Sequence, residues 1–371
     1  MKNYRVFVVN PGSTSTKVAL FEGEQTLFEA NVSHDAAELA KFVQVKDQLP
    51  YRIQTIEQAL AEKGIALEHI DACVGRGGGL LPMAGGTYKE TPLLLEHSIR
   101  GANGVQHPAM LGISIAKHFA DKLGCPVFTV NPPDVDEYIP EARITGIKGV
   151  YRKSHLHALN LKETAIRHAA AIGKRYEDCN FVVCHIGGGV SVSAHRRGCM
   201  IDGHDIAGGE GPIAPTRCGT IPVSELLQVL EESGQSCKEL RQICTKTGGL
   251  VSHLGTSDGR EVRRRIAEGD GYAKLVWDAM LYQIAKYIGS MVVALQGQVD
   301  AILLGGGLVH DQGVVGYIRE NCGFLAPVVA YPGEFELEAM AQGAVRVLSG
   351  QEEAKEYTAA SVWDIHDITK A

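Results

Sequence analysis

Two hairpin-like segments, far apart in the chain, constrain its fold more than any other feature. Residues 4–21 contain an apolar run, a turn rich in small and hydroxyl residues, and a second apolar run. Residues 181–202 repeat this order around the glycine corner HIGGGVS. Such apolar runs suit buried strands, and Pro-Gly or Gly/Ser corners suit the turns between them. Because helical patterns follow each segment, the sequence predicts two similar α/β domains that face one another.

The rest of the chain alternates strands with helices. The runs DACVGRGGG and AILLGGG each predict a buried strand that ends at a glycine corner, where backbone approaches a neighbour or a ligand closely. These corners predict a cleft lined by backbone. Helices are predicted over 52–63, 109–123, 157–172, 223–232, 272–295 and 336–348. Too few helices follow residue 338 for a third domain, so we expect them to pack on the first domain.

The composition narrows the class of partner. A chain of 371 residues with 45% hydrophobic and 21% charged residues is typical of a globular protein of two or three domains. Its net charge of −7 disfavours nucleic acid and anionic membrane as partners, since both need a basic surface. We find neither a secretory signal pattern nor an apolar run of about eighteen residues, and therefore expect a cytoplasmic location without membrane contact.

Cysteine and histidine usage predicts no metal or disulfide framework. The nine cysteines include no CxxC pair, which favours reduced thiols in the core. The fourteen histidines form no HExxH or comparable pattern. A small-molecule ligand bound by other groups is therefore expected.

One turn raises the possibility of phosphate binding. NPGSTSTK at 10–17 crowds backbone N–H groups and hydroxyls into a small space, which suits a phosphate group as well as a plain hairpin. Further motifs stand in order after it: GRGG at 75–78, RKSHLHALN at 152–160, HIGGGVSVSAHRRG at 185–198, TRCG at 216–219 and YPGEFELEAMAQGA at 331–344. Together they resemble the acetate and butyrate kinase family over nearly the whole chain.

This resemblance implies a fold and a reaction. The fold would be α/β, with two similar ribonuclease H-like (actin-like ATPase) domains and an interdomain cleft. Residues 1–153 and 338–371 would form the first domain, and 154–337 the second, which binds the nucleotide. The reaction would be reversible phosphoryl transfer between ATP and a short-chain carboxylate, giving ADP and an acyl phosphate. The GRGG signature favours butyrate. Mg²⁺ and a homodimer or higher homo-oligomer are also implied.

The resemblance also implies roles for particular residues. Arg217 in TRCG would contact the transferring phosphoryl group, whose equatorial oxygens suit a guanidinium fork. The implied catalytic residues are Asn10, Arg76, His157 and Arg217. The implied phosphate and nucleotide contacts are Ser13, Ser15, Lys17, His185, Gly187, Gly188, Gly189, Ser257, Asp258, Arg260, Gly305, Gly306 and Gly307. Asn10 and Glu336 would serve the metal, with Glu334 and Glu338 as alternative carboxylates. The two histidines could instead be core residues.

The chain departs from the family pattern at two positions. Cys73 stands where acetate kinases carry the arginine that holds the substrate carboxylate, and Arg76 could take over this role from a shifted position. Asn131 replaces a family aspartate, so that Asp134 or Asp136 would have to substitute for its charge.

Other functions remain open from the sequence. Another short-chain or branched-chain acyl kinase, for acetate, propionate or isobutyrate, would carry the same motifs. An actin-like or Hsp70-like ATP-binding module would have no use for Arg217. A sugar kinase needs a catalytic aspartate for its alcohol nucleophile, and no aspartate here stands in such a motif.

Overall fold

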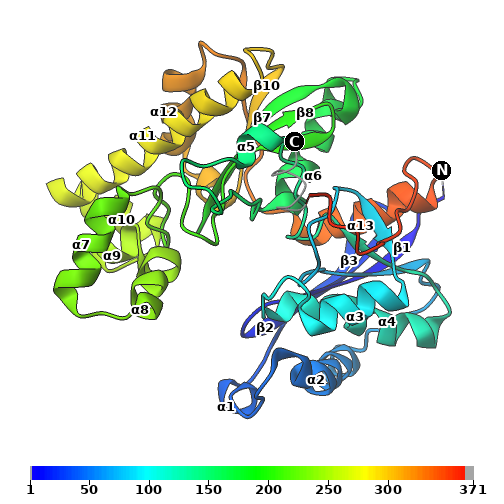
Figure 1. Ribbon diagram of the computed structural model, residues 1–371. Coiled ribbons are helices and arrows are strands. Elements are labelled where there is room, and N and C mark those ends of the chain that lie inside the picture. Colours follow the sequence, from blue (N-terminus) through cyan, green and yellow to red (C-terminus); the bar gives the residue numbers. More distant parts are fainter. Residues whose placement is uncertain (1, 364–371) are drawn as a thin grey trace. The chain divides into compact units, whose positions relative to one another are not determined.

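The computed structural model describes residues 2–363 and divides the chain into two compact units. The first unit comprises Met1–Asp136 and Phe335–Ala371, and the second comprises Glu137–Glu334. The domain boundaries predicted from sequence lie nearby, at 153/154 and 337/338, and that division stays a prediction. Residues 364–371 of the first predicted domain lie outside the described residues. Figure 1 follows the chain through both units.

The first unit is built on a six-stranded sheet. Its strands are β1 (Arg5–Pro11), β2 (Ser15–Glu22), β3 (Gln25–Ser33), β4 (Ala72–Gly75), β5 (Thr87–Lys89) and β6 (Val127–Val130), in the order β3-β2-β1-β4-β6-β5. β1 pairs with β2, and β2 with β3, in antiparallel fashion, whereas β4 runs parallel to β1 and to β6. The predicted hairpin at 4–21 is confirmed.

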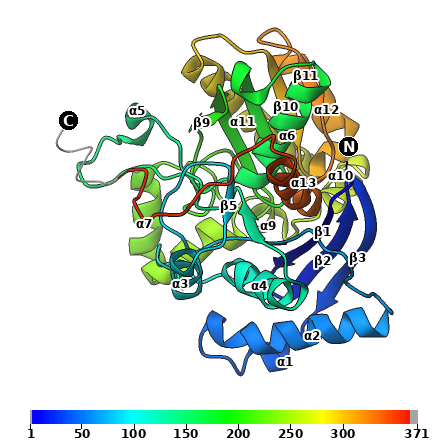
Figure 2. The ribbon, with the colours of Figure 1, turned by 90° about the vertical axis from the view of Figure 1, so that its right-hand side faces the viewer.

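Helices cover both faces of this sheet. They are α1 (Ala36–Leu39), α2 (Leu49–Glu62), α3 (Pro92–Arg100), α4 (Gly112–Leu123) and α13 (Glu336–Leu348). Alternate residues of β1, Phe7 and Val9, join Ile56 of α2 and Ile115 of α4 in one apolar core. α13 packs on the opposite face, where Gly343 meets Val130 of β6 (Figure 2). The expected return of the last helix to the first domain is therefore confirmed.

The second unit repeats this topology. Its strands are β7 (Asn180–Ile186), β8 (Val190–Arg196), β9 (Cys199–Asp202), β10 (Ala301–Gly305) and β11 (Val328–Ala330), in the order β11-β10-β7-β8-β9. β7, β8 and β9 form an antiparallel meander, and β10 runs parallel to β7 and to β11. Both units thus place an antiparallel hairpin beside a parallel strand, as the two matching sequence segments predicted.

The helices of the second unit are α5 (Pro140–Arg143), α6 (Ala158–Ala171), α7 (Val223–Ser233), α8 (Cys237–Gln242), α9 (Leu250–Leu254), α10 (Gly259–Ala267), α11 (Gly271–Ala294) and α12 (Gln312–Cys322). α11 supplies the centre of the core, in which Met280, Ile284 and Ile288 are fully buried. The predicted helix at 109–123 begins with a separate 3-10 turn, Pro108–Leu111, and His157 caps α6 rather than lying inside it.

Among the described residues, none of the helices has both the length and the apolar character needed to span a membrane.

Candidate active site

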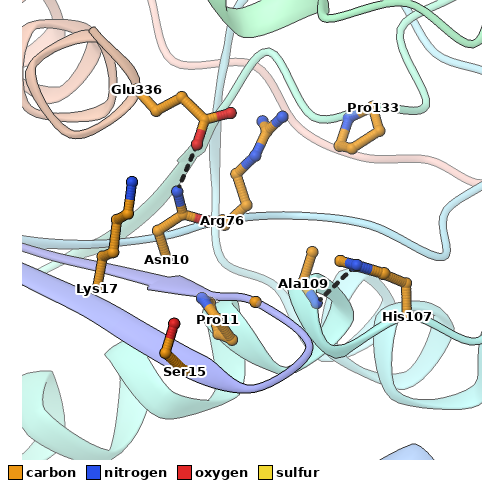
Figure 3. A pocket seen from close by; sticks show the side chains of 10 residues that line it. Asn10, Pro11, Ser15, Lys17, Arg76, His107, Ala109, Pro133 and Glu336 are labelled. Atoms are coloured by element: carbon orange, nitrogen blue, oxygen red, sulfur yellow. Dashed lines mark hydrogen bonds between the residues drawn. The ribbon is translucent and has the colours of Figure 1, made fainter. Parts of the chain in front are cut away.

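A cavity of about 270 Å³ lies in the first unit, beside the β1–β2 turn. Figure 3 shows it from close by, and it is lined by Asn10, Pro11, Gly12, Ser15, Lys17, Arg76, His107, Ala109, Pro133 and Glu336. The structure therefore brings together residues that the sequence singled out from three distant motifs. The hairpin register explains part of this, because Asn10 and Lys17 are direct cross-strand partners and share one face.

Glu336 is the carboxylate of this cavity. It lies in the first turn of α13, and Asn10 Nδ2 donates a 2.8 Å hydrogen bond to its Oε2. The alternative Glu338, on the same helix, is not among the lining residues. A carboxylate and an amide oxygen are donors that Mg²⁺ accepts, so Asn10 and Glu336 fit the metal contact expected from sequence.

Arg76 brings a buried positive charge to the same cavity. Only 8% of this residue is exposed, and its Nη1 donates to the backbone carbonyl of Asn131 over 3.2 Å. Burial lowers the pKa of Arg76, while the negative charges of Glu336 and Asp134 act in the opposite direction. In Figure 3 the guanidinium extends toward Glu336. A carboxylate ligand could replace part of the hydration that Arg76 has lost.

Asn131, which stands in place of the family aspartate, has a structural role. Asn131 adopts a positive φ of 39°, and its Oδ1 accepts a 2.7 Å hydrogen bond from the Gly86 backbone N–H. Asp134 accepts from Asn103 Nδ2 over 2.6 Å, and Asp136 accepts from Trp363 Nε1 over 2.8 Å. None of the three lines the cavity.

A fully buried arginine, which the sequence analysis did not single out, holds the β1–β2 turn. Arg52 of α2 donates from Nη2 to the Ser13 carbonyl and from Nη1 to Thr16 Oγ1, both over 3.1 Å. Burial lowers the pKa of Arg52 to about 10. Ser13 itself is exposed and does not line the cavity. The spacing of Arg52 from Ile56 and Leu60, on the buried stripe of α2, was a signal for this residue.

His107 is a second cavity residue absent from the sequence predictions. Its Nδ1 accepts a hydrogen bond from the Ala109 backbone N–H over 3.2 Å. Burial of the ring, followed by the charges of Arg76 and Arg52, lowers the pKa of His107. The neutral ring therefore carries its proton on Nε2.

In the second unit, two histidines lie at the glycine corner that follows β7. The rings of His157 and His185 stack with their centroids 3.9 Å apart. His157 Nδ1 lies 2.8 Å from Ser191 Oγ. A Cβ on Gly189 would lie 3.4 Å from His157, and one on Gly187 would lie 2.9 Å from His185 Nε2. Glycine at these positions keeps the backbone close to both rings.

The loop that carries Arg217 is tied to this corner. The Gly188 carbonyl accepts hydrogen bonds from Thr216, from its backbone N–H over 3.2 Å and from its Oγ1 over 2.9 Å. Arg217 is half-buried and forms no ion pair, and its buried Nε has no hydrogen-bond partner within the described part of the chain. Burial alone lowers the pKa of Arg217. The loop thus holds a cation that an anionic ligand could satisfy.

A larger cavity of about 650 Å³ lies in the same unit. It is lined by Asp258, Gly259, Arg260, Arg263, Trp277, Gly307, Leu308, His310 and Asp311. Asp258, Arg260 and Gly307 were predicted, whereas Trp277 and Arg263 were not, because neither stands in a recognisable motif. Ser257 does not line it. Trp277 and Leu308 give this cavity apolar side chains beside several polar groups, a combination that suits a nucleoside.

The glycines after β10 connect this cavity to the histidine corner. Gly305 is the direct neighbour of His185 in the parallel β10–β7 pair. Gly306 has a φ of 94°, and a Cβ there would lie 2.5 Å from the Ile186 carbonyl oxygen. Gly306 therefore cannot be exchanged without moving β7.

Two sheets of matching topology, each with a glycine-rich corner after its strands, define the actin-like ATPase fold. Solved structures of this fold are similar to the chain. An acetate kinase from Porphyromonas gingivalis has a TM-score of 0.76 at 19% identity, covering 93% of this chain and 100% of that one. A propionate kinase from Francisella tularensis subsp. tularensis has a TM-score of 0.72 at 20% identity, covering 92% and 98%. A ROK hexokinase from Thermus thermophilus scores 0.50 at 15% identity, covering 93% and 99%. The predicted fold class is confirmed.

The sequence model of the acetokinase family matches residues 137–321. Over these residues the chain matches the acetokinase family, whose members are ATP-dependent carboxylate kinases. The alternative of a binding module that transfers no phosphoryl group is thereby set aside.

Proposed function

We propose that this protein is a butyrate kinase, which transfers a phosphoryl group reversibly between ATP and butyrate. The observation that carries the carboxylate site is the convergence of Asn10, Lys17, Arg76 and Glu336 on one cavity of the first unit. The choice of butyrate over acetate, propionate or isobutyrate rests on the GRGG signature at 75–78.

The cavity supplies what a carboxylate acceptor requires. The guanidinium of Arg76 would hold the acid through charge-assisted hydrogen bonds, in place of the family arginine that Cys73 replaces. A carboxylate is already a competent nucleophile, so the site needs no general base to activate it. Lys17 and Ser15 would bind the transferred phosphate.

The second unit would bind and activate the nucleotide. The cavity at Trp277 and Gly307 would take the nucleoside, and the backbone of Gly187–Gly189 would contact the phosphates. Arg217 would bind the phosphoryl group as its charge spreads in the transition state, with His157 and His185 as further contacts.

The residues fit a nucleotide-bound Mg²⁺ better than a resident metal. Among the described residues, no group of three or more His, Cys, Asp and Glu side chains could hold a metal ion. Mg²⁺ commonly binds through one or two carboxylates together with substrate phosphates and water. Glu336 and Asn10 would provide the protein's share, and the ion would neutralise phosphate charge.

A hydroxamate assay with ATP, Mg²⁺ and acids of increasing chain length tests this function. We expect butyrate to give a higher kcat/KM than acetate. Arg76→Gln should raise KM for the acid and leave KM for ATP little changed, because the lost contact is to the acid. Arg100→Gln, at an exposed arginine of the same unit, serves as the matched control.

The outcomes separate the substrate from the reaction class. Equal or better turnover of acetate would remove the butyrate assignment and leave a short-chain acyl kinase. No hydroxamate with any acid would contradict the proposed function as a whole. Thermal denaturation of Arg76→Gln shows whether the loss of its bond to Asn131 has unfolded the site.

A further inference from the structure

Asn160 is a buried amide that joins three segments of the second unit. It lies on α6 and is 2% exposed. Its Nδ2 donates to the backbone carbonyl of Glu334, and its Oδ1 lies 2.9 Å from His185 Nδ1. A carbonyl oxygen can only accept a hydrogen bond, so the NH₂ group of the amide must face Glu334. The orientation of Asn160 is therefore determined by the backbone.

This orientation decides where His185 carries its proton. The amide oxygen of Asn160 can only accept, so the ring nitrogen that faces it, Nδ1, must be an N–H donor. In the neutral ring, Nε2 then carries the lone pair. Protonation of the ring adds a proton at Nε2 and leaves the Nδ1–H bond to Asn160 intact. The ring consequently keeps its orientation in both charge states.

Nε2 is the nitrogen that faces the glycine corner. The Cβ that a residue larger than glycine would carry at position 187 would lie 2.9 Å from it. Two charged or titratable groups near this nitrogen are the stacked ring of His157 and the carboxylate of Glu334, whose Oε1 would lie 3.8 Å from the same Cβ. A phosphate oxygen at this corner would meet Nε2 as an N–H donor only when the ring is protonated.

The fold explains why Asn160 contacts His185, whereas His157 contacts Ser191. His157 and Asn160 are three residues apart at the start of α6, so their side chains share one helix face. His185 and Ser191 are direct partners in the β7–β8 pair, so their side chains share one sheet face. Asn160 meets His185, and His157 meets Ser191.

The second pair lacks the same power to select a tautomer. Ser191 Oγ accepts from the His157 backbone N–H over 3.3 Å, and its hydroxyl can still donate to Nδ1 of that ring or accept from it. Only the amide of Asn160 imposes one answer.

We infer that Asn160 is a positioning residue that holds His185 as the Nδ1–H tautomer, with Nε2 directed at the glycine corner, Gly187–Gly189. The consequence for catalysis rests on the proposed function, but the tautomer itself does not. With Asn160 in place, His185 needs no ring flip to donate to a phosphate oxygen when it gains a proton.

Long-range ¹H–¹⁵N NMR of the full chain, labelled with ¹⁵N-histidine, tests the tautomer directly. Pyrrole-type and pyridine-type ring nitrogens have well separated ¹⁵N shifts, and a His185→Gln sample assigns the signal. Above the pKa of the ring, we expect Nδ1 to be of the pyrrole type and Nε2 of the pyridine type. The reverse pattern in the wild-type protein would overturn the inference without any variant of Asn160.

Variants of Asn160 test whether this residue sets the tautomer of His185 and whether the tautomer matters for the reaction. Asn160→Leu should allow the Nε2–H tautomer of His185. It also removes the acceptor that holds the protonated ring with Nε2 toward the corner, so kcat should fall by about 10- to 100-fold, the usual cost of losing an orienting partner, with KM for ATP little changed. Asn160→Asp retains an acceptor and should restore the Nδ1–H signal and part of kcat. Ser191→Ala should leave the His185 shifts unchanged.

Each result has a definite meaning. An unchanged tautomer in folded Asn160→Leu overturns the role of Asn160. A changed tautomer with wild-type kcat overturns its part in the reaction. If wild-type protein forms no acyl phosphate, the proposed function fails, and the NMR result still decides the tautomer.

Discussion

Three buried or half-buried arginines mark the site at the scale of single residues. Arg52, Arg76 and Arg217 form no ion pair with any carboxylate of the described residues, and burial lowers the pKa of each. A guanidinium without a counter-ion is costly to bury. Arg52 offsets this cost through hydrogen bonds to the β1–β2 turn, whereas Arg217 keeps an unsatisfied Nε. Arg217 is therefore prepared for an anionic ligand.

Replacing Arg217 tests this interpretation. Arg217→Ala should lower kcat about a thousandfold, roughly 4 kcal/mol of transition-state stabilisation, and leave KM for ATP little changed. Arg217→Lys should recover only part, since a point charge cannot reproduce the planar fork. Arg241→Ala, at an exposed arginine of the same unit, is the control. A well-folded Arg217→Ala protein within threefold of wild-type kcat would place Arg217 outside the reaction.

At the scale of elements, hydrogen bonds connect α2 to β2, the strand that follows the β1–β2 turn. His34 Nε2 lies 2.8 Å from Thr16 Oγ1, and Nδ1 lies 3.3 Å from Thr55 Oγ1. The Thr55 hydroxyl donates to the Arg52 carbonyl, so it accepts from Nδ1–H of His34. Thr16 accepts from Arg52 and donates to Nε2 of His34. These hydrogen-bond directions fit a neutral imidazole that carries its proton on Nδ1.

The pH dependence of stability follows from His34. Burial, and then the charge of Arg52, lower its pKa from 6.5 to about 4. The unfolded chain therefore binds a proton between these values that the folded chain does not. The stability from the neutral ring is fully present above pH 6.5 and is lost as pH falls toward 4, by about 2–3 kcal/mol.

Urea unfolding at pH 7 and pH 5 measures this effect. His34→Gln cannot titrate and should show a smaller loss between the two pH values than wild type. His69→Asn, at an exposed position, should keep the wild-type loss. An equal loss in His34→Gln and wild type would show that other groups cause it.

The packing of α13 on the sheet gives a second prediction at this scale. A Cβ on Gly343 would lie 2.5 and 2.6 Å from the two Cγ atoms of Val130, which is β-branched and cannot turn aside. Gly343→Ala should therefore destabilise the protein by about 1–3 kcal/mol. Gly316→Ala, at an open position in the middle of α12, should instead stabilise it by up to about 1 kcal/mol. Equal thermal midpoints for the two variants would contradict this packing.

At the scale of the whole molecule, two units of the same topology carry different chemistry. The first holds the cavity beside the β1–β2 turn, for which we propose the carboxylate, and the second holds the cavity at Trp277, for which we propose the nucleoside, together with the corner of His157 and His185. The described residues include no cluster that would hold a structural metal. The homodimer expected from the resemblance, and the cytoplasmic location, stay predictions.

Chelation separates a catalytic metal from a structural one. EDTA should abolish acyl phosphate formation, because the β- and γ-phosphate charge needs a divalent ion and Asn131 carries no negative charge to bind one. It should leave the thermal midpoint unchanged. Added Mg²⁺ should restore turnover, and undiminished turnover after exhaustive chelation would rule out metal-assisted transfer.

Local pattern was enough to determine the repeated strand-turn-strand segments, the return of the last helix and the family. The alternation of apolar runs with glycine corners is a pattern among residues close in the sequence. It can therefore be recognised from a single sequence. β3 was missed because most of its residues are exposed or half-buried, and β5 because it has three residues.

The tertiary structure alone decided which predicted residues share a cavity. Lys17 and Glu336 line one cavity because α13 returns to the first sheet, whereas Ser13 is exposed and does not line it, although it stands in the same motif as Lys17. Arg52, His107 and Asn160 escaped prediction for the same reason. Arg52 and Asn160 act through partners elsewhere in the chain, and His107 lines a cavity formed by distant segments. Such contacts form only when helices and strands pack. Their roles depend on distances that no spacing along the sequence contains.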